Sequence, residues 1–537
     1  MSKFIFVTGG VVSSLGKGIA VASIARILKS RGISVSVLKL DPYLNVDPGT
    51  MSPYQHGEVF VTGDGSETDL DLGHYERFIG MSLTGASNLT AGKIYSDVIA
   101  KERKGEFLGG TIQVVPHVTD AIKSHMFYLS EKSQADVIVV EVGGTVGDIE
   151  GLPFLEAIRQ MRNEVGSSNV FYVHLTYLPY VTTTNELKTK PTQHSVRELR
   201  SIGILPDAII CRSDHKVSES IKDKITIHCD VPIKGILTLQ TVESVYEVPS
   251  ILEKQGLGDL IFNHMQIQAN ETDMHDWNKM VDLIKKPKPN IKIAVVGKYV
   301  DLTDSYISVK EALIHAGIFY NRNVELVWIN SEDIEKNGAD KYLSFVSGIV
   351  VPGGFGPRGV EGMIETVRYS IENNIPYLGL CLGMQVMVIS VARSILGREM
   401  ANSLEFSTET PDPVISLMHN QKDVENLGGT MRLGIYPCEI VENSISHRAY
   451  GSVDLVQERH RHRFEFNNEY RKELDDIGLK ATGLSPDGNL VEIMELESHP
   501  FMVGVQFHPE FLSRPDEPHP LFSEFIKFSS EVSKNIE

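Results

Sequence analysis

The sequence predicts an α/β fold made of two doubly wound domains. Strand-like apolar runs alternate with helical patterns from residue 4 onward, and the alternation begins again near residue 291. This order is typical of parallel sheets with helices on both faces. At 537 residues the chain is also too long for one hydrophobic core. A segment ending in Lys-Lys-Pro-Lys-Pro separates the halves, so we predict domains over residues 1–266 and 291–537 and a linker over 267–290.

The composition excludes several functional classes. Hydrophobic residues make up 42% of the chain and charged residues 23%, which are ordinary values for a globular protein. A net charge of -19 disfavours non-specific nucleic-acid binding, so we expect no nucleic-acid partner. Because no apolar run would span a bilayer and no leader pattern opens the chain, we expect a cytoplasmic protein without a membrane partner. The four cysteines form no CxxC pair, which favours a reducing compartment.

The first predicted element is a strand over residues 4–7 that leads into a glycine-rich turn at 8–18 and a helix over 19–28. In such a unit the backbone N–H groups of the turn hold a phosphate, and Lys17 would add a point charge. The spacing departs from the strict phosphate-loop motif, because Gly18 stands where Ser or Thr normally follows the lysine. We predict a variant phosphate loop, and the alternative is a glycine-containing turn without a ligand.

The second strand covers residues 34–40 and brings Lys39 and Asp41 to the edge where open α/β sheets bind ligands. Residues 45–65 are rich in glycine, proline and threonine and contain few helix formers. Loops of this length usually carry function. We predict a long ordered loop over this sheet.

Acidic residues next in the chain favour a magnesium site. Three carboxylates stand at alternate positions, at Glu67, Asp69 and Asp71. They suit a hard cation that bridges phosphates, and a solvated acidic turn would have the same composition. A buried-looking strand over residues 136–144 carries Glu141, and phosphate-loop enzymes place such an acid on the metal side. We therefore predict that Asp71 and Glu141 bind Mg²⁺ beside Lys17.

The rest of the first half continues the sheet, with predicted strands over residues 170–175, 208–211 and 233–237. Asp148 and Glu150 lie in a turn before a helix predicted over 153–165, where they would meet a ligand or cap that helix. Residues 186–195 hold two lysines, two threonines and a glutamine around a proline. A triphosphate and a pyrimidine edge would use such a set, and a polar surface loop would also have this composition.

The second half begins with predicted strands over residues 291–296, 324–329 and 348–352, and the last runs into the glycine-rich segment 353–359. Residues 375–385 then form an apolar strand, a Gly-x-Cys-x-Gly turn and the start of a helix. This is the cysteine form of a nucleophile elbow, in which the turn lifts the thiol of Cys381 clear of the sheet and the helix N-terminus stabilises the thiolate. The alternative is a buried structural cysteine.

A thiolate nucleophile also needs a base and an orienting acid. An apolar strand over residues 502–507 delivers His508, and Glu510 follows it after one proline. His460 and His462 compete for the role of base, but the arginines around them favour carboxylate binding. We predict a Cys381–His508–Glu510 triad.

Three motifs of the second half, at residues 353–356, 379–383 and 508–510, together resemble the class I glutamine amidotransferases. In that family the cysteine attacks the glutamine amide, and two backbone N–H groups hold the oxyanion. With residues 39–43, 55–60 and 188–193 added, essentially the whole chain resembles the CTP synthase family. The short acidic segment 408–426 is expected to be a variable loop.

The resemblance implies that ATP phosphorylates the 4-oxygen of UTP and that ammonia from glutamine displaces the phosphate, giving CTP, ADP and phosphate. The catalytic residues that it implies are Cys381, His508, Glu510, Lys17 and Lys39, with Mg²⁺ on Asp71 and Glu141. Those implied for ATP are Ser14, Leu15, Gly16, Lys17, Gly18, Ile19 and Asp71, with Gln240, Thr241 and Val242 near adenine. Those implied for UTP or the inhibitor CTP are Ser13, Asp148, Ile149, Glu150, Lys188, Thr189, Lys190, Pro191, Thr192, Gln193 and Lys224. Those implied for glutamine are Tyr54, Gly354, Leu382, Gly383, Met384, Gln385, Glu405 and Arg463.

The resemblance also implies a closed ammonia tunnel, with Pro53, His56 and Val59 at its gate, and GTP as an allosteric activator, with Arg358 in a lid. Members of the family form homotetramers through the synthetase domain, and UTP and ATP promote assembly. Two alternatives stay open: another ATP-dependent glutamine amidotransferase that acts on a carboxylate, and a catalytically silent assembly protein with the same fold.

Overall fold

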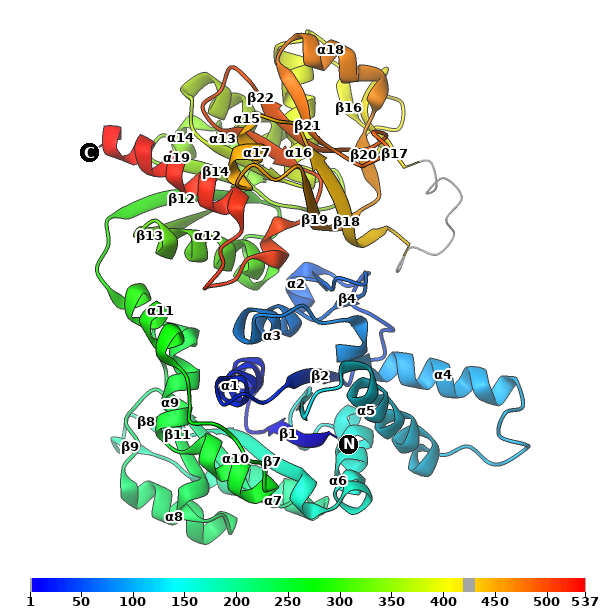
Figure 1. Cartoon of the computed structure of the whole chain (residues 1–537), viewed down its shortest axis with the longest axis vertical. Helices are drawn as coiled ribbons and strands as arrows, with labels where there is room; N and C mark the ends of the chain where they lie inside the picture. The colour runs from blue at the N-terminus through cyan, green and yellow to red at the C-terminus, as the bar shows by residue number, and fades with distance from the viewer. Residues whose placement is uncertain (1, 419–429, 537) are drawn as a thin grey trace. The chain divides into compact units, whose positions relative to one another are not determined.

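The computed structural model describes residues 2–418 and 430–536. The chain forms two compact α/β units, the first from Met1–Asp47 and Asp71–Ile284 and the second from Pro48–Leu70 and Lys285–Glu537 (Figure 1). The segment predicted as a linker, residues 267–290, contains helix α11 (His275–Lys285), nearly all of which belongs to the first unit. The last residue of the predicted linker, Asn290, is the first residue of strand β12.

The first unit is built on a parallel sheet. Within the described residues this sheet has seven strands in the order β11-β10-β7-β1-β6-β2-β5, and each neighbouring pair runs parallel. The strands are β1 (Lys3–Gly9), β2 (Val35–Asp41), β5 (Asn88–Thr90), β6 (Val137–Val142), β7 (Val170–Tyr177), β10 (Ala208–Ser213) and β11 (Ile236–Gln240). The predicted strand over residues 233–237 begins three residues too early, because residues 233–235 form a 3₁₀ turn.

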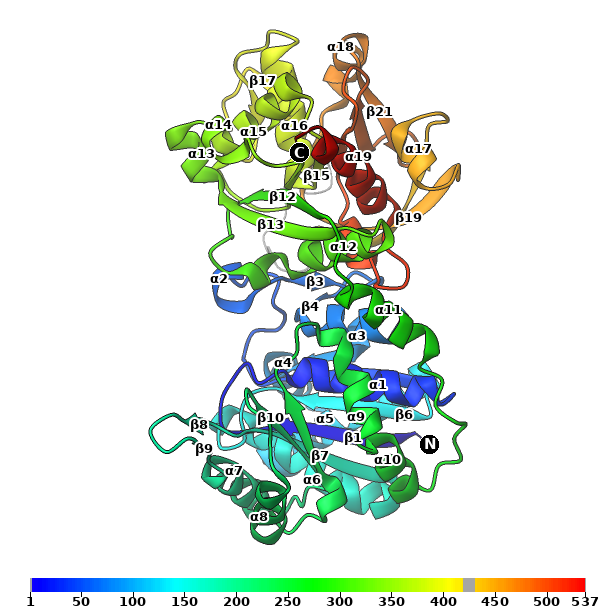
Figure 2. The same ribbon diagram turned by 90° about the vertical axis from the view of Figure 1, so that its left-hand side faces the viewer.

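Helices cover both faces of this sheet (Figures 1 and 2). Its helices include α1 (Lys17–Ser30), α3 (Asp71–Ile79), α4 (Ala91–Arg103), α5 (Thr119–Ser133), α6 (Leu152–Val165), α7 (Lys190–Ser201), α8 (Glu219–Cys229), α9 (Val248–Lys254) and α10 (Leu257–Met265). Side chains alternate along a strand, so Phe4 and Phe6 of β1 both face the core that α5 and α6 cover. Helix α1 packs on α3 and α9. The doubly wound prediction is confirmed for this unit.

The second unit contains a mixed sheet. Its nine strands, counted over the described residues, have the order β13-β12-β14-β15-β23-β22-β21-β18-β19. The parallel strands are β12 (Asn290–Gly297), β13 (Asn323–Asn330), β14 (Gly348–Val351), β15 (Tyr377–Leu380) and β23 (Met502–Val505). The antiparallel extension consists of β22 (Val491–Leu496), β21 (Leu479–Leu484), β18 (Arg432–Ile440) and β19 (Leu455–His462).

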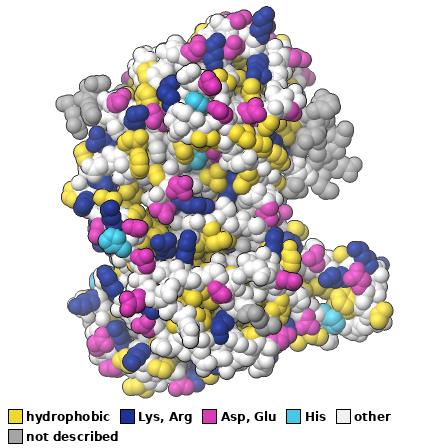
Figure 3. Space-filling view, viewed as in Figure 1, with side chains coloured by type: hydrophobic (Ala, Val, Ile, Leu, Met, Phe, Trp, Pro, Cys, Tyr) yellow, Lys and Arg dark blue, Asp and Glu magenta, His cyan; other side chains and the backbone are white. Residues whose placement is uncertain are grey.

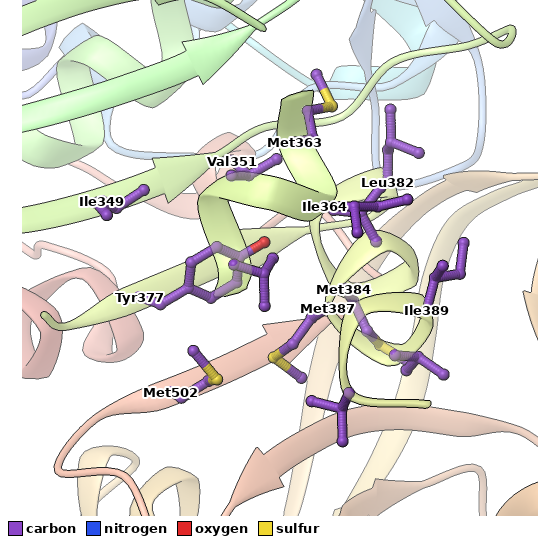
Figure 4. Close-up of a cluster of buried hydrophobic side chains, with 14 of the residues drawn as sticks. Ile349, Val351, Met363, Ile364, Tyr377, Leu382, Met384, Met387, Ile389 and Met502 are labelled. Atoms are coloured by element: carbon purple, nitrogen blue, oxygen red, sulfur yellow. The ribbon is translucent and has the colours of Figure 1, made fainter. Parts of the chain in front are cut away.

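Two hydrophobic cores lie on the two faces of this sheet. One is covered by α13 (Ser331–Asn337), α15 (Val360–Asn373) and α16 (Leu382–Ser394), and it includes Tyr377 and Met502 from the sheet (Figure 4). The other is covered by α12 (Ile307–Phe319) and α19 (Pro520–Ile536). Helix α16 is buried from Leu382 to Ala392, so the helix that follows Cys381 is fixed on every side.

The loop predicted over residues 45–65 belongs, from Pro48 onward, to the second unit. Residues 48–70 contain helix α2 (Pro53–His56) and the hairpin β3 (Phe60–Val61) and β4 (Glu67–Thr68), and they belong to the second unit. Buried Glu58 accepts a hydrogen bond from the backbone N–H of Ser308 at 3.1 Å. Arg459 donates to the carbonyl of Val61 at 3.1 Å. These long-range partners, which sequence pattern does not reveal, determine where the segment packs.

The segment expected to be a variable loop, residues 408–426, is partly regular. Strand β17 (Asp412–Leu417) pairs with β16 (Ala401–Ser403) and β20 (Phe464–Phe466). Residues 419–426 of this prediction lie outside the described residues.

The described residues contain no helix with the length and apolar character needed to cross a membrane. All four cysteines are described, and each is free and buried. Charged side chains of both signs are interspersed on the face seen in Figure 3.

Candidate active sites

The predicted phosphate loop connects β1 to α1, as expected. Its backbone is strained, because Val11 and Ser14 have φ angles of 80° and 53°. Gly16, with φ 86°, precedes the first residue of the helix, Lys17. The Lys17 ammonium donates to the Gly144 carbonyl at 2.7 Å. Burial lowers the pKa of Lys17, and nearby Lys39 lowers it further, against the carboxylates around it.

Lys39 and Glu141 occupy adjacent strands of the sheet. The Lys39 Nζ donates to Glu141 Oε1 at 2.8 Å and to the carboxylate of Asp71, the first residue of α3. Tyr75, one turn further along α3, donates its hydroxyl to the second oxygen of Glu141. The structure therefore brings together Lys39, Asp71 and Glu141, as predicted, next to Lys17.

This cluster fits the predicted magnesium ion. Asp71 and Glu141 supply hard oxygen donors that already share one cation, the Lys39 ammonium. Mg²⁺ is usually held by one or two carboxylates together with substrate phosphates. A group of three or more acidic, histidine or cysteine ligands is not found in the described parts of the chain, and this type of site does not need one.

The two other acids of the alternate trio are not part of this cluster. Glu67 forms an ion pair with Arg461 at 2.8 Å, and Asp69 lies 3.4 Å from Nε2 of His56. Both acids belong to the second unit, whereas Asp71 belongs to the first. The interpretation that all three hold one cation is wrong, because the described residues contain no group of three such ligands placed to hold a metal ion.

The glycine at position 18 has a steric explanation. A Cβ there would lie 2.0 Å from Oδ1 of Asp71. The Ser or Thr that normally follows the lysine and coordinates a metal would therefore clash with Asp71. Glycine at this position leaves room for the Asp71 carboxylate. This observation supports the transfer of the metal-binding task from the loop to the carboxylates.

Most of the residues predicted for the pyrimidine nucleotide lie on two segments of the chain, and Ser13 and Lys224 lie outside them. Thr189, the N-cap of α7, and Lys190, Thr192 and Gln193 in its first turn form one segment. The Thr192 side chain is buried and donates to the Thr176 hydroxyl at 3.1 Å. Lys188 and Lys224 both lie close to the exposed carboxylate of Glu186.

The second segment is the turn around Asp148, which follows β6. Asp148 accepts a hydrogen bond from the Thr145 N–H at 2.8 Å, so it stabilises its own turn. Ile149 and Glu150 are exposed, and Ile149 retains 80% of its accessible surface. Ser13, in the phosphate loop, is also exposed.

Arg212 is a binding candidate that sequence reasoning missed. Its guanidinium donates to the Leu15 carbonyl at 3.3 Å and to the Thr241 hydroxyl at 3.2 Å. It therefore joins the phosphate loop to the segment 240–242, which was predicted to lie near adenine. Its position at the carboxyl end of β10 was the signal that would have found it.

In the second unit, Cys381 occupies the predicted elbow between β15 and α16. Its φ of 52° and ψ of −98° confirm the strained turn. Leu382 opens α16, so its N–H is one of those without a partner inside the helix. A Cβ on Gly353 would lie 2.9 Å from the His508 ring and 3.8 Å from the Cys381 Cβ. The glycine segment and the elbow thus face the same point.

His508 and Glu510 complete this site. The Nδ1 of His508 donates to Glu510 Oε1 at 2.7 Å, and both side chains are buried. Burial alone would lower the pKa of His508, but the Glu510 carboxylate and the neighbouring Cys381 raise it to about 10. The imidazole is therefore protonated at neutral pH and can act as a proton donor.

The competing histidines are excluded as the base by their surroundings. His460 and His462 are buried, and Nδ1 of His460 lies 3.1 Å from Nε2 of His462. Burial, together with Arg432, lowers the pKa of His462 to about 3. The arginines around them pair with carboxylates of the chain itself, Arg461 with Glu67 at 2.8 Å and Arg432 with Glu492 at 2.7 Å.

Several predicted glutamine ligands form hydrogen bonds within the second unit. Gln385 is buried and donates to the Phe464 carbonyl at 3.2 Å. Glu405 accepts from the Gly356 N–H at 2.7 Å, and Arg463 donates to Thr430 at 2.9 Å. The sequence prediction missed Gln506, whose amide donates to the Cys381 sulfur at 3.6 Å.

A cavity of about 360 Å³ opens on Cys381. Its walls include Pro53, Glu58 and Val59, all from the segment that the second unit holds. Tyr54 lies nearby and donates to the Lys298 carbonyl, which also accepts from Arg358 at 2.8 Å. Of the predicted gate residues, Pro53 and Val59 line the cavity.

Buried Lys298 supports the glycine segment beside this cavity, and sequence reasoning did not select it. Its Nζ donates to the carbonyl of Phe355 at 3.1 Å and to that of Gly356. Burial lowers the pKa of Lys298 to about 8.

Comparison with known proteins agrees with the division of the chain into two units. Residues 3–267 match the family model "CTP synthase N-terminus", and residues 301–528 match "Glutamine amidotransferase class-I". A CTP synthase from Dehalococcoides mccartyi is 61% identical over all of this chain and 98% of that protein. One from Carboxydothermus hydrogenoformans is 57% identical over 99% of this chain and 100% of its own length. A solved structure described as the glutaminase domain of Trypanosoma brucei CTPS with bound acivicin is 38% identical, covers 45% of this chain and 94% of that chain, and has a TM-score of 0.43. The chain therefore belongs to the CTP synthase family, whose members are glutamine-hydrolysing ligases.

Proposed function

We propose that the first unit phosphorylates the 4-oxygen of UTP with ATP and that ammonia then displaces this phosphate to give CTP. The observation that carries the proposal is the meeting of Lys17, Lys39, Asp71 and Glu141 at the carboxyl end of one parallel sheet. Phosphoryl transfer requires such positioned charges more than it requires covalent chemistry. Lys17 holds the ATP phosphates and Lys39 stabilises the transferring group. Mg²⁺, held by Asp71 and Glu141, would neutralise charge on the β- and γ-phosphates.

The second unit supplies the ammonia. The Cys381 thiolate attacks the side-chain amide carbon of glutamine, and the N–H groups after Gly353 and Cys381 hold the oxyanion. The His508 imidazolium gives its proton to the leaving ammonia, and Glu510 keeps the ring in place. Water then hydrolyses the thioester to release glutamate.

Ammonia must leave this site without gaining a proton from bulk water. The cavity on Cys381 supports such a route, because two of the proposed gate residues, Pro53 and Val59, line it. His56, the third proposed gate residue, interacts with Asp69 close to the point where the chain returns to the first unit. We propose that the tunnel begins at this cavity.

Regulation and assembly follow the family. CTP would inhibit at the turn around Asp148, and GTP would activate through a lid that contains Arg358, which already contacts Tyr54 at 3.1 Å. A homotetramer is supported by apolar side chains on the arm formed by α4 and the following loop, which projects from the first unit (Figure 1). Leu108 there is 95% exposed and Ile99 58%. The free cysteines support a reducing, cytoplasmic location.

The purified protein with UTP, ATP, Mg²⁺ and glutamine tests this function. We expect CTP, ADP, phosphate and glutamate in equal amounts. ATP turnover on a carboxylic acid without CTP formation would favour the alternative, a carboxylate-amidating synthetase. If the purified protein has neither glutaminase nor synthetase activity, the alternative of a catalytically silent assembly protein would be favoured.

A further inference from the structure

A fully buried histidine connects the phosphate loop to the helix proposed to bind UTP. His174 lies on β7 and has no exposed surface. Its Nδ1 lies 2.8 Å from the Thr8 hydroxyl, and its Nε2 lies 2.8 Å from the Ser195 hydroxyl. Thr8 is two residues before the first residue of the loop, Gly10, and Ser195 is on α7. One imidazole thus joins two elements that lie 187 residues apart in sequence.

The direction of these hydrogen bonds follows from the third partner. The Thr8 hydroxyl donates to the Val173 carbonyl at 3.4 Å, so it accepts from the Nδ1–H of His174. Nε2 is then unprotonated and accepts from the Ser195 hydroxyl. Burial, aided by the charge of Lys17, lowers the pKa of His174 to about 3, so this neutral tautomer persists at physiological pH.

The phosphate loop and helix α7 are packed closely together around the histidine. A Cβ on Gly10 would lie 1.6 Å from the Ser195 hydroxyl oxygen and 3.1 Å from His174 Nε2. The Gly10 N–H also donates to the Leu175 carbonyl at 3.0 Å. The loop backbone therefore lies directly against α7 and β7, and a shift of one requires a shift of the other.

Helix α7 contains the residues proposed for UTP in its first turn, and Ser195 follows Gln193 by two positions. We propose that His174 is a positioning residue, which holds the phosphate loop and α7 at one spacing so that ATP and UTP bind interdependently. This inference rests on the proposed function, because it takes the nucleotide of each element from there. The Ser195–His174–Thr8 chain would transmit a displacement of α7 by UTP to the loop that binds ATP.

The test removes the two outer hydroxyls and keeps the histidine. Ser195→Ala deletes the hydrogen bond to Nε2 of His174. Thr8→Val deletes the one to Nδ1 together with the weaker bond to the Val173 carbonyl. Both substitutions change the shape little, and the double variant frees both nitrogens of the imidazole. Tyr172→Phe is the matched control. Tyr172 is also buried on β7 and donates to the Ile158 carbonyl at 2.7 Å, but it takes no part in the hydrogen bonds that join Ser195, His174 and Thr8. Ammonia-dependent CTP synthesis is measured with UTP varied at several fixed ATP concentrations, and thermal unfolding is measured for every variant.

Each single variant should raise the KM for UTP about two- to tenfold. In each, the KM for UTP should also depend less on the ATP concentration than it does in the parent protein. The double variant should be no worse than the poorer single variant, because either deletion already releases the imidazole. Effects that multiply, an unchanged dependence of the UTP KM on ATP, or the same loss of interdependence in Tyr172→Phe would overturn the inference. A parent protein that makes no CTP would instead refute the proposed function.

Discussion

The imidazole of His508 donates to the carboxylate of Glu510 at 2.7 Å inside the cavity that contains Cys381. Burial, which would lower the pKa of His508, is outweighed by this carboxylate and by Cys381, and the pKa reaches about 10. The ring therefore carries its proton from acidic pH up to that value. The same proton is the one that departing ammonia needs.

Replacement of that carboxylate should move the pH dependence of glutamine hydrolysis. In Glu510→Gln, burial dominates and the pKa of His508 falls, so the alkaline limb of the rate profile should move to lower pH. At neutral pH the rate should fall about 10²- to 10⁴-fold. Steady-state glutaminase assays between pH 6 and roughly 10 would measure both effects. An unchanged alkaline limb would show that Glu510 does not control His508.

Cys381→Ala should separate the two nitrogen sources. Glutamine-dependent CTP synthesis should disappear, because no thioester can form, and ammonia-dependent synthesis should be unchanged. CTP formation is measured with glutamine and with ammonium chloride in parallel. Loss of both activities would contradict the division of labour between the two units.

Lys17→Ala should stop synthesis from either source. The charge that holds the ATP phosphates during the transfer is removed, and we expect a loss of about 10²- to 10³-fold. Glutaminase activity without nucleotides serves as the control for folding. Substantial ammonia-dependent synthesis in this variant would show that the loop has another role.

Gly18→Ala should also impair synthesis, although alanine is chemically inert. The added Cβ would meet Asp71 Oδ1 at 2.0 Å and push this carboxylate away from Lys39 and Glu141. The Mg²⁺ concentration needed for half-maximal synthesis should rise, whereas glutamine hydrolysis and thermal unfolding should change little. A normal Mg²⁺ dependence would mean that Asp71 is not a metal ligand.

Features formed by residues close in sequence could be predicted from the sequence. The turn before Lys17 and the elbow at Cys381 each lie within one strand–turn–helix unit, so glycine spacing and apolar runs reveal them. The structure confirms both turns, including the positive φ of Cys381. The positive φ of Val11 was not predictable, because a β-branched residue gives no sign of that conformation.

Features that depend on distant partners could not be predicted. Nothing in residues 48–70 indicates that Glu67 pairs with Arg461 or that Glu58 bonds to Ser308. His174 lies in an ordinary apolar strand, and its role depends on the pairing of β7 with β1 in the sheet. Sequence pattern gives the strands but not which strand ends become neighbours.

The most direct test of the account follows the oxygen atom at position 4 of UTP. UTP labelled with ¹⁸O at that position is converted with unlabelled ATP and ammonia, and the released inorganic phosphate is analysed by mass spectrometry. If the 4-oxygen attacks the γ-phosphate of ATP and leaves with it, each molecule of CTP formed should release one labelled phosphate. Unlabelled phosphate, with the ¹⁸O found in water, would contradict the proposed phosphorylated intermediate.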